Sequence, residues 1–285
     1  MSVLQIHAQP GRVAVQALSW FLFAVGLAAY FWISTARHRE NADDRVTPTL
    51  LQMGKGFADA ILKPAEEDEV TADADGQPLL TKIRHSMLWK DTEATGRRFA
   101  ISLALLFPAV LLGLHMGMFP YVGTFFLRFV LFFDKIVALS LLPILFIAFG
   151  IDELAKVMLI VIGVAPTIIL DAFNLARGVP REQIVKDFTL GAGDFSVTYR
   201  IVFKQIFPRV LNSIRLNLKA VMLFLFAGEM IASSDGLAYR IALLRRHMGM
   251  DTIIPYVLWV ALLLFLVDFG MRVLNRRLHP WFQEA

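Results

Sequence analysis

Long runs of residues without a charged side chain constrain this chain more than any other feature. Residues 13–33 and 99–118 contain no Asp, Glu, Lys or Arg. About 20 helical residues are enough to cross the roughly 30 Å hydrocarbon core of a bilayer. Four further stretches hold few charged side chains, namely 129–149, 157–176, 214–234 and 252–272. The sequence therefore predicts an all-α polytopic membrane protein with about six transmembrane helices.

Composition supports this class and excludes several others. Hydrophobic residues make up 57% of the chain and charged residues only 18%, which is far more apolar than an average soluble domain. The absence of cysteine excludes disulfides, thiolate metal sites and a cysteine nucleophile. The small excess of 28 Lys and Arg over 24 Asp and Glu is better explained by cytoplasmic loops than by nucleic acid, so no nucleic-acid partner is expected.

The distribution of basic residues predicts the orientation. Lys and Arg collect between the fourth and fifth predicted spans and after the sixth, and such loops are usually cytoplasmic. An even number of spans then places the N-terminus inside. We expect three parts: residues 1–33 as a cytoplasmic segment and first transmembrane helix, 34–98 as a periplasmic connection, and 99–285 as the core. The arginines within 235–251 are an exception, since that loop would be external.

The periplasmic connection contains two contrasting segments. Thr47 and Pro48 favour a helix start, and apolar residues at helical spacing follow, so 48–62 is predicted as an amphipathic helix at the membrane interface. The acidic, small-residue run at 65–78 cannot bury much apolar surface and is predicted to be an external loop.

A polar segment at about 180–207 predicts two short cytoplasmic helices. Pro180 suits a first helical turn, and Gly191 suits the end of that helix. A second helix is expected to stop at Phe207, because Pro208 follows. The apolar face of Ile184, Val185 and Phe188 suits a groove on another protein, although an ordinary cytoplasmic loop with helical content fits the same pattern.

The same segment resembles the cytoplasmic signature of the permease subunits of binding-protein-dependent ABC importers. That signature reads EAA, three residues, Gly, nine residues, Ile, one residue, Leu-Pro. Gly191 and Ile201 occupy the glycine and isoleucine positions. The chain departs from the signature at EAA, which is replaced by Val185-Lys186-Asp187, and at Leu-Pro, which is replaced by Phe203-Lys204. In such permeases this segment contacts the ATPase subunit, so the departures bear on how that subunit docks.

Further matches resemble the nitrate, sulfonate and taurine branch of these permeases. They are Leu142-Pro143-Ile144, Phe149-Gly150-Ile151-Asp152-Glu153, Pro208, Ser213-Ile214-Arg215, Gly228-Glu229-Met230 and Gly236-Leu237-Ala238. The ordered series covers about 91–282 and is more specific than any single motif. It implies the fold of a type I ABC importer permease.

The resemblance also implies partners and the residues that meet them. Such a permease pairs with a second permease, here expected to be a homodimer, with two copies of an ABC ATPase and with a periplasmic substrate-binding protein, in the bacterial inner membrane. The chain has no GxxxxGK[ST] phosphate loop, so ATP and Mg are expected only in the ATPase, and this subunit is expected to be non-catalytic and to bind no cofactor. The implied ATPase-coupling residues are Gln183, Ile184, Val185, Lys186, Asp187, Phe188, Leu190, Gly191, Ala192, Ile201 and Pro208.

Four residues are candidates for the translocation path or its gate. A carboxylate within a span is costly, so Glu229 must face a polar path, a partner or another helix, and both a gate and a hydrogen-bond anchor satisfy that requirement. Met230 follows it in the family motif. Pro143 and Pro166 can break two spans and expose carbonyls, or merely kink packed helices.

Three classes of function fit an apolar bundle of this kind. The favoured one is an ABC importer permease for a small anion such as nitrate, a sulfonate or bicarbonate. The alternative is a secondary transporter driven by an ion gradient, which usually has more spans and an internal repeat. A membrane enzyme is least favoured, because no hydrolase or metalloprotease motif occurs. No metal site is expected, since the two HMGM sequences, at 115–118 and 247–250, would lie on opposite sides of the membrane.

Overall fold

A computed structural model describes residues 12–40, 46–62 and 86–282. Within these residues every regular element is a helix, which confirms the predicted all-α class. The chain divides into two compact units, one formed by Met1–Asp59 with Leu244–Pro255 and the other by Ala60–Leu243 with Tyr256–Ala285. The acidic run predicted at 65–78 lies outside the described residues.

The first unit contains helix α1 (Arg12–Glu40) and most of helix α2 (Leu50–Leu62). The hydroxyl of Tyr30 donates to the carbonyl of Pro48, and that of Ser34 to the carbonyl of Thr47, both at 2.9 Å. The predicted amphipathic helix is present, but its first turn is capped by Thr49 and not by Thr47. The Thr49 amide donates to Gln52 Oε1 at 2.7 Å and the Gln52 amide to Thr49 Oγ1 at 3.4 Å, a reciprocal capping box.

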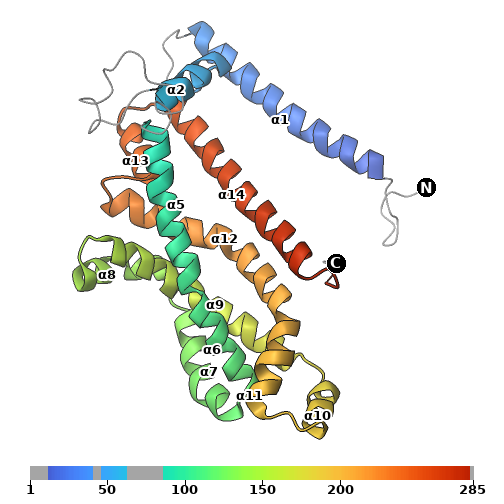
Figure 1. The fold of residues 1–285 in the computed structure, drawn as a ribbon. Helices are drawn as coiled ribbons and strands as arrows, with labels where there is room; N and C mark the ends of the chain where they lie inside the picture. The colour runs from blue at the N-terminus through green and yellow to red at the C-terminus, as the bar shows by residue number, and fades with distance from the viewer. Residues whose placement is uncertain (1–11, 41–45, 63–85, 283–285) are drawn as a thin grey trace, which may run out of the picture. The chain divides into compact units, whose positions relative to one another are not determined.

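The second unit holds the remaining helices, two of which, α13 and α14, also contribute residues to the first. Figure 1 labels most of these helices along the chain. In chain order they are α5 (Met87–Leu105), α6 (Phe107–Met118), α7 (Pro120–Asp134), the 3-10 helix η2 (Ala138–Leu141), α8 (Leu142–Phe149), α9 (Glu153–Arg177), α10 (Arg181–Thr189), α11 (Asp194–Ser196), the π-helix η3 (Val197–Phe203), α12 (Lys204–Ala232), α13 (Leu237–Arg246) and α14 (Met250–Leu278).

Five helical stretches in the described residues are long and apolar enough to cross a membrane. They are Val15–Arg39, Met87–Met118, Glu153–Arg177, Asp194–Ala232 and Met250–Leu278. The pair Pro120–Asp134 and Ala138–Phe149, which bends by 85° at its break, raises the number to as many as six. The predicted third span, 129–149, therefore corresponds to part of a bent helix pair and not to one continuous helix. The polar pair Asp134 and Lys135 lies at the bend, where Asp134 accepts a hydrogen bond from Thr167.

The second span begins twelve residues before the predicted start at 99. Ser86 caps α5 by accepting a hydrogen bond from the Trp89 amide at 3.3 Å, and the helix then runs through several charged residues. Asp91 and Arg98 are each only 1% exposed. A buried charge is tolerated only when other groups in the protein pair with it, and the partners of these two lie far along the chain.

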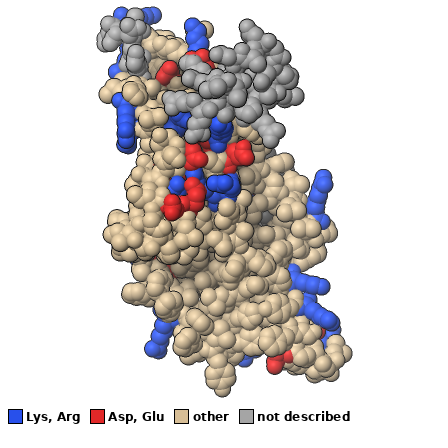
Figure 2. All heavy atoms as spheres, turned by 60° about the vertical axis from the view of Figure 1, so that its left-hand side comes forward, with Lys and Arg blue, Asp and Glu red and all other residues tan. Residues whose placement is uncertain are grey.

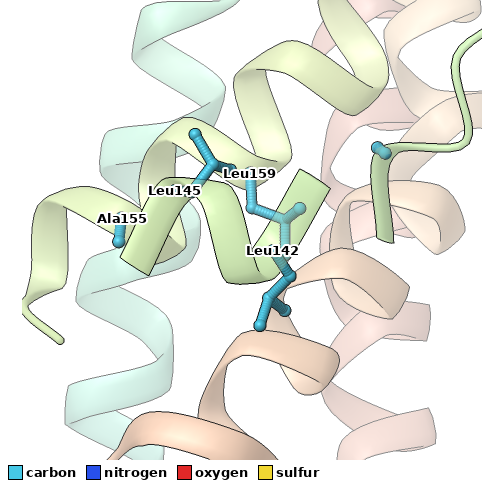
Figure 3. Packing of buried hydrophobic residues seen from close by; sticks show 5 residues of the cluster. Leu142, Leu145, Ala155 and Leu159 are labelled. Carbon is cyan, nitrogen blue, oxygen red and sulfur yellow. The ribbon is translucent and has the colours of Figure 1, made fainter. Parts of the chain in front are cut away.

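Helix α9 forms the centre of the second unit and packs closely against α6. A side chain at Gly117 would start 2.6 Å from the Cβ of Ala176, so the two backbones approach within a distance that only glycine permits. At the other end of α9, Ala155 and Leu159 pack against Leu142 and Leu145 of α8 (Figure 3). Pro166 lies inside α9 without ending it, so the fourth span is unbroken.

Candidate functional site

The predicted cytoplasmic segment folds into a helix, a glycine turn and a second helical stretch, which we call the α10 module (residues 180–203). The last turn of α10 closes with two hydrogen bonds, from the Gly191 amide to the Phe188 carbonyl at 3.0 Å and from the Ala192 amide to the Asp187 carbonyl at 3.1 Å. This pairing is a Schellman motif, with Gly191 at a φ of +85°. Within the Leu-Gly-Ala sequence at 190–192, this helix end therefore requires the glycine, because its position alone has a positive φ.

Gly191 is required for its backbone conformation and not for lack of space. Nothing lies within 4 Å of the position that its Cβ would occupy. The turn therefore keeps its shape through local hydrogen bonds. By contrast, Gly193, two residues later, has a φ of −82°, which any residue adopts.

The second helix of the module does not stop at Phe207 as predicted. The π-helix η3 leads directly into α12, which continues through Pro208. Proline removes one hydrogen bond inside a helix. Tertiary contacts offset that loss, because Pro208 is buried and its carbonyl accepts a hydrogen bond from the Asn275 side chain at 3.0 Å.

The structure separates the predicted coupling residues into two groups. Those of α10 and its turn lie together on a short, largely exposed element, with Val185 58%, Phe188 43% and Leu190 77% exposed. This exposed group also contains Gln183, Ile184, Lys186, Asp187, Gly191 and Ala192, each exposed or half-buried. Ile201 is half-buried in η3, and Pro208 is buried, so neither forms part of the exposed α10 surface.

Aromatic contacts join the α10 module to α6. His115 Nδ1 lies 2.7 Å from the Leu111 carbonyl, which can only accept, so in the neutral ring Nε2 accepts a hydrogen bond from the Tyr199 hydroxyl at 2.9 Å. The rings of Phe119 and Phe195 lie 5.6 Å apart. These contacts fix the start of the second helical stretch against the end of α6.

A second site lies at the other end of α12, where charged and polar side chains form a cluster. We call it the Arg98 cluster; its members are Asp91, Thr95, Arg98, Glu153, Lys156, Glu229, Asp235 and Arg240. Glu229 is in the last turn of α12, so at 1.5 Å per residue it lies about 40 Å from the start of the helix. Figure 1 shows α10 and α13 at opposite ends of α12.

Arg98 is the centre of this cluster and its guanidinium is fully paired. Nε and Nη2 donate to the two oxygens of Glu153 at 2.5 and 2.6 Å, and Nη1 donates to Glu229 Oε1 at 2.9 Å. Nη2 also pairs with the Asp235 carboxylate, and Nη1 donates to the Asp235 carbonyl at 3.1 Å. One side chain of α5 therefore joins α9, α12 and the loop that precedes α13.

The first amides of α13 are capped by side chains from distant elements. Gly236 N donates to Asp91 Oδ1 at 3.1 Å, Leu237 N to Thr95 Oγ1 at 2.9 Å, and Ala238 N to Glu229 Oε2 at 3.1 Å. Helix N-terminal amides normally rely on a neighbouring residue for this purpose. Here α5 and α12 provide the caps, so the position of α13 depends on both helices.

Gly236 is required at this point both for space and for conformation. Its φ is +112°, and an added Cβ would start 2.7 Å from the Glu229 carboxylate and 2.8 Å from Arg98 Nη1. A larger residue would displace the central ion pair.

The outer members of the cluster also pair with one another. Arg240 Nε donates to Asp91 Oδ2 at 2.9 Å. Burial alone would lower the pKa of Arg240, but the hydrogen bond and charge of Asp91 raise that pKa above its ordinary value. Lys156 Nζ donates to Glu153 at 3.3 Å and to Ser233 at 3.0 Å. Figure 2 shows acidic and basic side chains gathered on one face of a largely uncharged surface.

The four candidates for the translocation path do not form one site. Glu229 is fully buried and saturated with hydrogen bonds from Arg98, Thr95 and Ala238. Pro143 is in the first turn of α8. Pro166 lies 13 residues beyond Glu153 on α9, about 20 Å along the helix from the Arg98 cluster. Met230 is 39% exposed beside Glu229.

Most residues of the Arg98 cluster were not identified as site residues from the sequence. One available signal is that Arg98 directly precedes the uncharged run at 99–118, so its charge lies at the edge of a membrane span and needs a partner. The sequence gives no indication that Glu153, Glu229 and Asp235 are those partners. In the described part of the chain, no three His, Asp or Glu side chains are grouped so as to hold a metal ion.

Comparisons with known proteins agree with this architecture. The family model of the binding-protein-dependent transport system inner membrane component matches residues 109–280. The chain is 28% identical over 200 residues to the taurine transport system permease protein TauC of Escherichia coli, covering 70% of this chain and 72% of that protein. It is 27% identical over 143 residues to a Bacillus subtilis protein provisionally named as an aliphatic sulfonates transport permease, SsuC, covering 50% and 52% of the two chains.

Solved structures show the same fold. A chain of the MetNI methionine ABC transporter, in an inward-facing conformation, matches with a TM-score of 0.57 at 16% identity and covers 67% of this chain and 95% of that one. The protein is a multi-pass helical membrane protein, and the family motifs follow one another along its sequence in the expected order. The chain belongs to the family of binding-protein-dependent transport system inner membrane components, the permease subunits of ABC importers.

Proposed function

We propose that this chain forms the transmembrane path by which a small sulfonate or a related small anion enters the cell. A periplasmic binding protein delivers the solute, and a cytoplasmic ATPase provides the energy. The observation that carries this proposal is the α10 module, a short exposed helix closed by a Schellman motif at Leu190, Gly191 and Ala192. A helix of this kind suits insertion into a groove on a partner.

The connection from α10 to the rest of the chain suits the transmission of movement. The Tyr199–His115 hydrogen bond fixes the module to α6, and η3 passes without interruption into the 29 residues of α12. Helix α12 ends in the Arg98 cluster, where Glu229 pairs with Arg98. A displacement of α10 by a bound ATPase would therefore reach the opposite end of the membrane through one continuous helix. Such a change shifts the population between inward-facing and outward-facing states.

The expected assembly is a homodimer of this permease with two ATPase subunits in the bacterial inner membrane. In this orientation the α10 module lies in the cytoplasm and the Arg98 cluster lies near the periplasm. The basic residues between α9 and α12 support the orientation.

The solute class rests on relatives named for taurine and aliphatic sulfonates. Taurine is an aminosulfonate, so a small organic sulfonate is the first candidate, ahead of nitrate and bicarbonate. Glu229 is proposed to be an anchor for α13 and not a solute ligand, because Arg98, Thr95 and the Ala238 amide occupy its oxygens.

The test is uptake by proteoliposomes that contain the permease with its ATPase and binding protein. Labelled taurine should accumulate only with internal ATP and with the binding protein outside. Uptake driven by a proton or sodium gradient, in vesicles without the ATPase, would favour the secondary-transporter alternative. Repeating the assay with nitrate and bicarbonate as competitors assigns the solute class.

A further inference from the structure

A cavity of about 780 Å³ lies between α10, the corner that joins α6 to α7, and the last turns of α9. Apolar side chains make up most of its lining, including Phe119 and Leu127 from α6–α7 and Val185 and Phe188 from α10. Its charged lining consists of two guanidinium groups and one carboxylate, from Arg177, Arg181 and Asp194. The cavity is therefore amphipathic, with a net positive charge.

The two arginines occupy a junction between a membrane span and a surface helix. Arg177 is the last residue of α9, and its guanidinium lies 5.5 Å from the centre of the Phe173 ring. Arg181 is the first residue of α10. Both residues are exposed to solvent. The end of a span next to a polar surface helix is the depth at which phospholipid headgroups lie.

The helix beside the cavity presents an aromatic surface. Pro120, Thr124 and Leu127 of α7 line the cavity. The adjacent face of the same helix carries Tyr121 and Phe125, which are 93% and 76% exposed. Exposed aromatic side chains at the end of a membrane helix are typical of contact with the interfacial region of the bilayer.

We propose that this cavity binds one anionic phospholipid, whose phosphate pairs with Arg177 and Arg181 and whose acyl chains lie along the aromatic face of α7. Basic pockets between membrane helices on the cytoplasmic side commonly recognise anionic headgroups. A small sulfonate needs much less volume and no apolar lining. The proposal rests on the proposed function only for the cytoplasmic placement of α10.

The bound lipid has a consequence for coupling. Ile184, Val185 and Phe188 of α10 line the cavity with part of their surface, while 58% of Val185 and 43% of Phe188 stay exposed and free to meet a partner. A lipid in the cavity therefore supports α10 from the side of the membrane. Without that lipid, α10 would be held less firmly against the rest of the chain, so a movement of α10 by the ATPase would be passed on less completely.

The experiment measures lipid bound to the purified chain by native mass spectrometry after reconstitution in nanodiscs of phosphatidylcholine with 30% phosphatidylglycerol. The double variant Arg177→Gln with Arg181→Gln should bind phosphatidylglycerol about 10- to 30-fold more weakly, because each basic residue near an anionic surface contributes roughly a factor of five. The matched control, Arg200→Gln with Arg209→Gln, removes two exposed arginines of η3 and α12 that do not line the cavity and should leave binding unchanged.

A second variant keeps both arginines and fills the space. Thr124→Trp should also displace the lipid while the circular dichroism spectrum and elution volume stay those of the parent protein. Equal loss in the control variant, or retention in both cavity variants, overturns the proposal. Displacement of lipid by free phosphate or taurine at millimolar concentration would instead assign the cavity to a small anion. Because binding is measured without ATPase or transport, its result is independent of the proposed function.

Discussion

The carboxylate of Glu229, in the last turn of α12, accepts a hydrogen bond from Arg98 of α5 at 2.9 Å, although 131 residues separate the two along the chain. Arg98 is 1% exposed and Glu229 is fully buried. Removing one partner of a buried pair leaves the other uncompensated, at a cost of roughly 3–5 kcal/mol. This pair therefore fixes the position of α13 as well as its own two helices.

We expect Glu229→Ala to lower the thermal stability of the detergent-purified protein strongly while leaving the solute KM of the remaining active fraction unchanged. The reason is that Glu229 binds protein groups on all sides. The control is Glu93→Ala, an exposed carboxylate on the same helix as Arg98, which should change stability by no more than about 0.5 kcal/mol. Thermal unfolding followed by tryptophan fluorescence, with uptake kinetics, measures both quantities. A raised KM with unaltered stability would show that Glu229 contacts the solute.

Gly236→Ala should destabilise the Arg98 cluster and the start of α13 by at least about 2 kcal/mol, since strained positive-φ backbone costs roughly 1–3 kcal/mol before any overlap is counted. The added methyl group would overlap the Arg98–Glu229 pair. Gly270→Ala in α14 is the control, because no atom lies within 4 Å of its Cβ position and alanine favours a helix. Hydrogen exchange at Leu237 and Ala238 should rise in the first variant only. Equal exchange in both variants would contradict the role assigned to Gly236.

Gly191→Pro should abolish ATP-driven uptake while the protein still inserts into the membrane. Proline cannot adopt the φ of +85° and has no amide hydrogen to donate to the Phe188 carbonyl. Gly193→Ala is the matched control, because Gly193 has an ordinary φ and open space around it. The ratio of ATP hydrolysed to solute transported, measured in proteoliposomes, should increase for the proline variant alone. Normal transport by that variant would exclude a coupling role for the turn.

Tyr199→Phe removes the hydrogen bond to His115 and keeps the contact between the two rings, which lie 5.6 Å apart. The expected loss of stability is about 1 kcal/mol, the usual contribution of a single hydrogen bond. Because this bond joins the α10 module to α6, we expect solute uptake to fall even though the loss in free energy of unfolding is small. Solute transported per ATP hydrolysed is the measurement, and Tyr121→Phe on the exposed face of α7 is the control. A parallel fall in both variants would argue against this connection.

The sequence predicted the elements that depend on local chemistry. Uncharged runs identified the spans, and Gly191 identified the end of α10, because a Schellman motif requires a residue at positive φ. The uncharged run at 99–118 lies within the second span, but the helix starts earlier, at Met87, because the charges of Asp91 and Arg98 are compensated by partners such as Arg240 and Glu229, far along the chain.

Two other boundaries depended on packing that no local pattern reveals. Pro208 was expected to end a helix, but burial and the Asn275 hydrogen bond keep the helix continuous. The third span bends by 85° where Asp134 meets Thr167. Local propensity identifies such elements, and tertiary contacts decide where they end.

The closing turn of α10 takes its shape from its own backbone hydrogen bonds, and no other group lies within 4 Å of the position that a Cβ on Gly191 would occupy. Such a structural unit is portable. Exchanging residues 181–193 between two importers of the same organism should make each permease couple to the other importer's ATPase subunit. Exchange of this one segment is then a route by which new pairings of permease and ATPase arise.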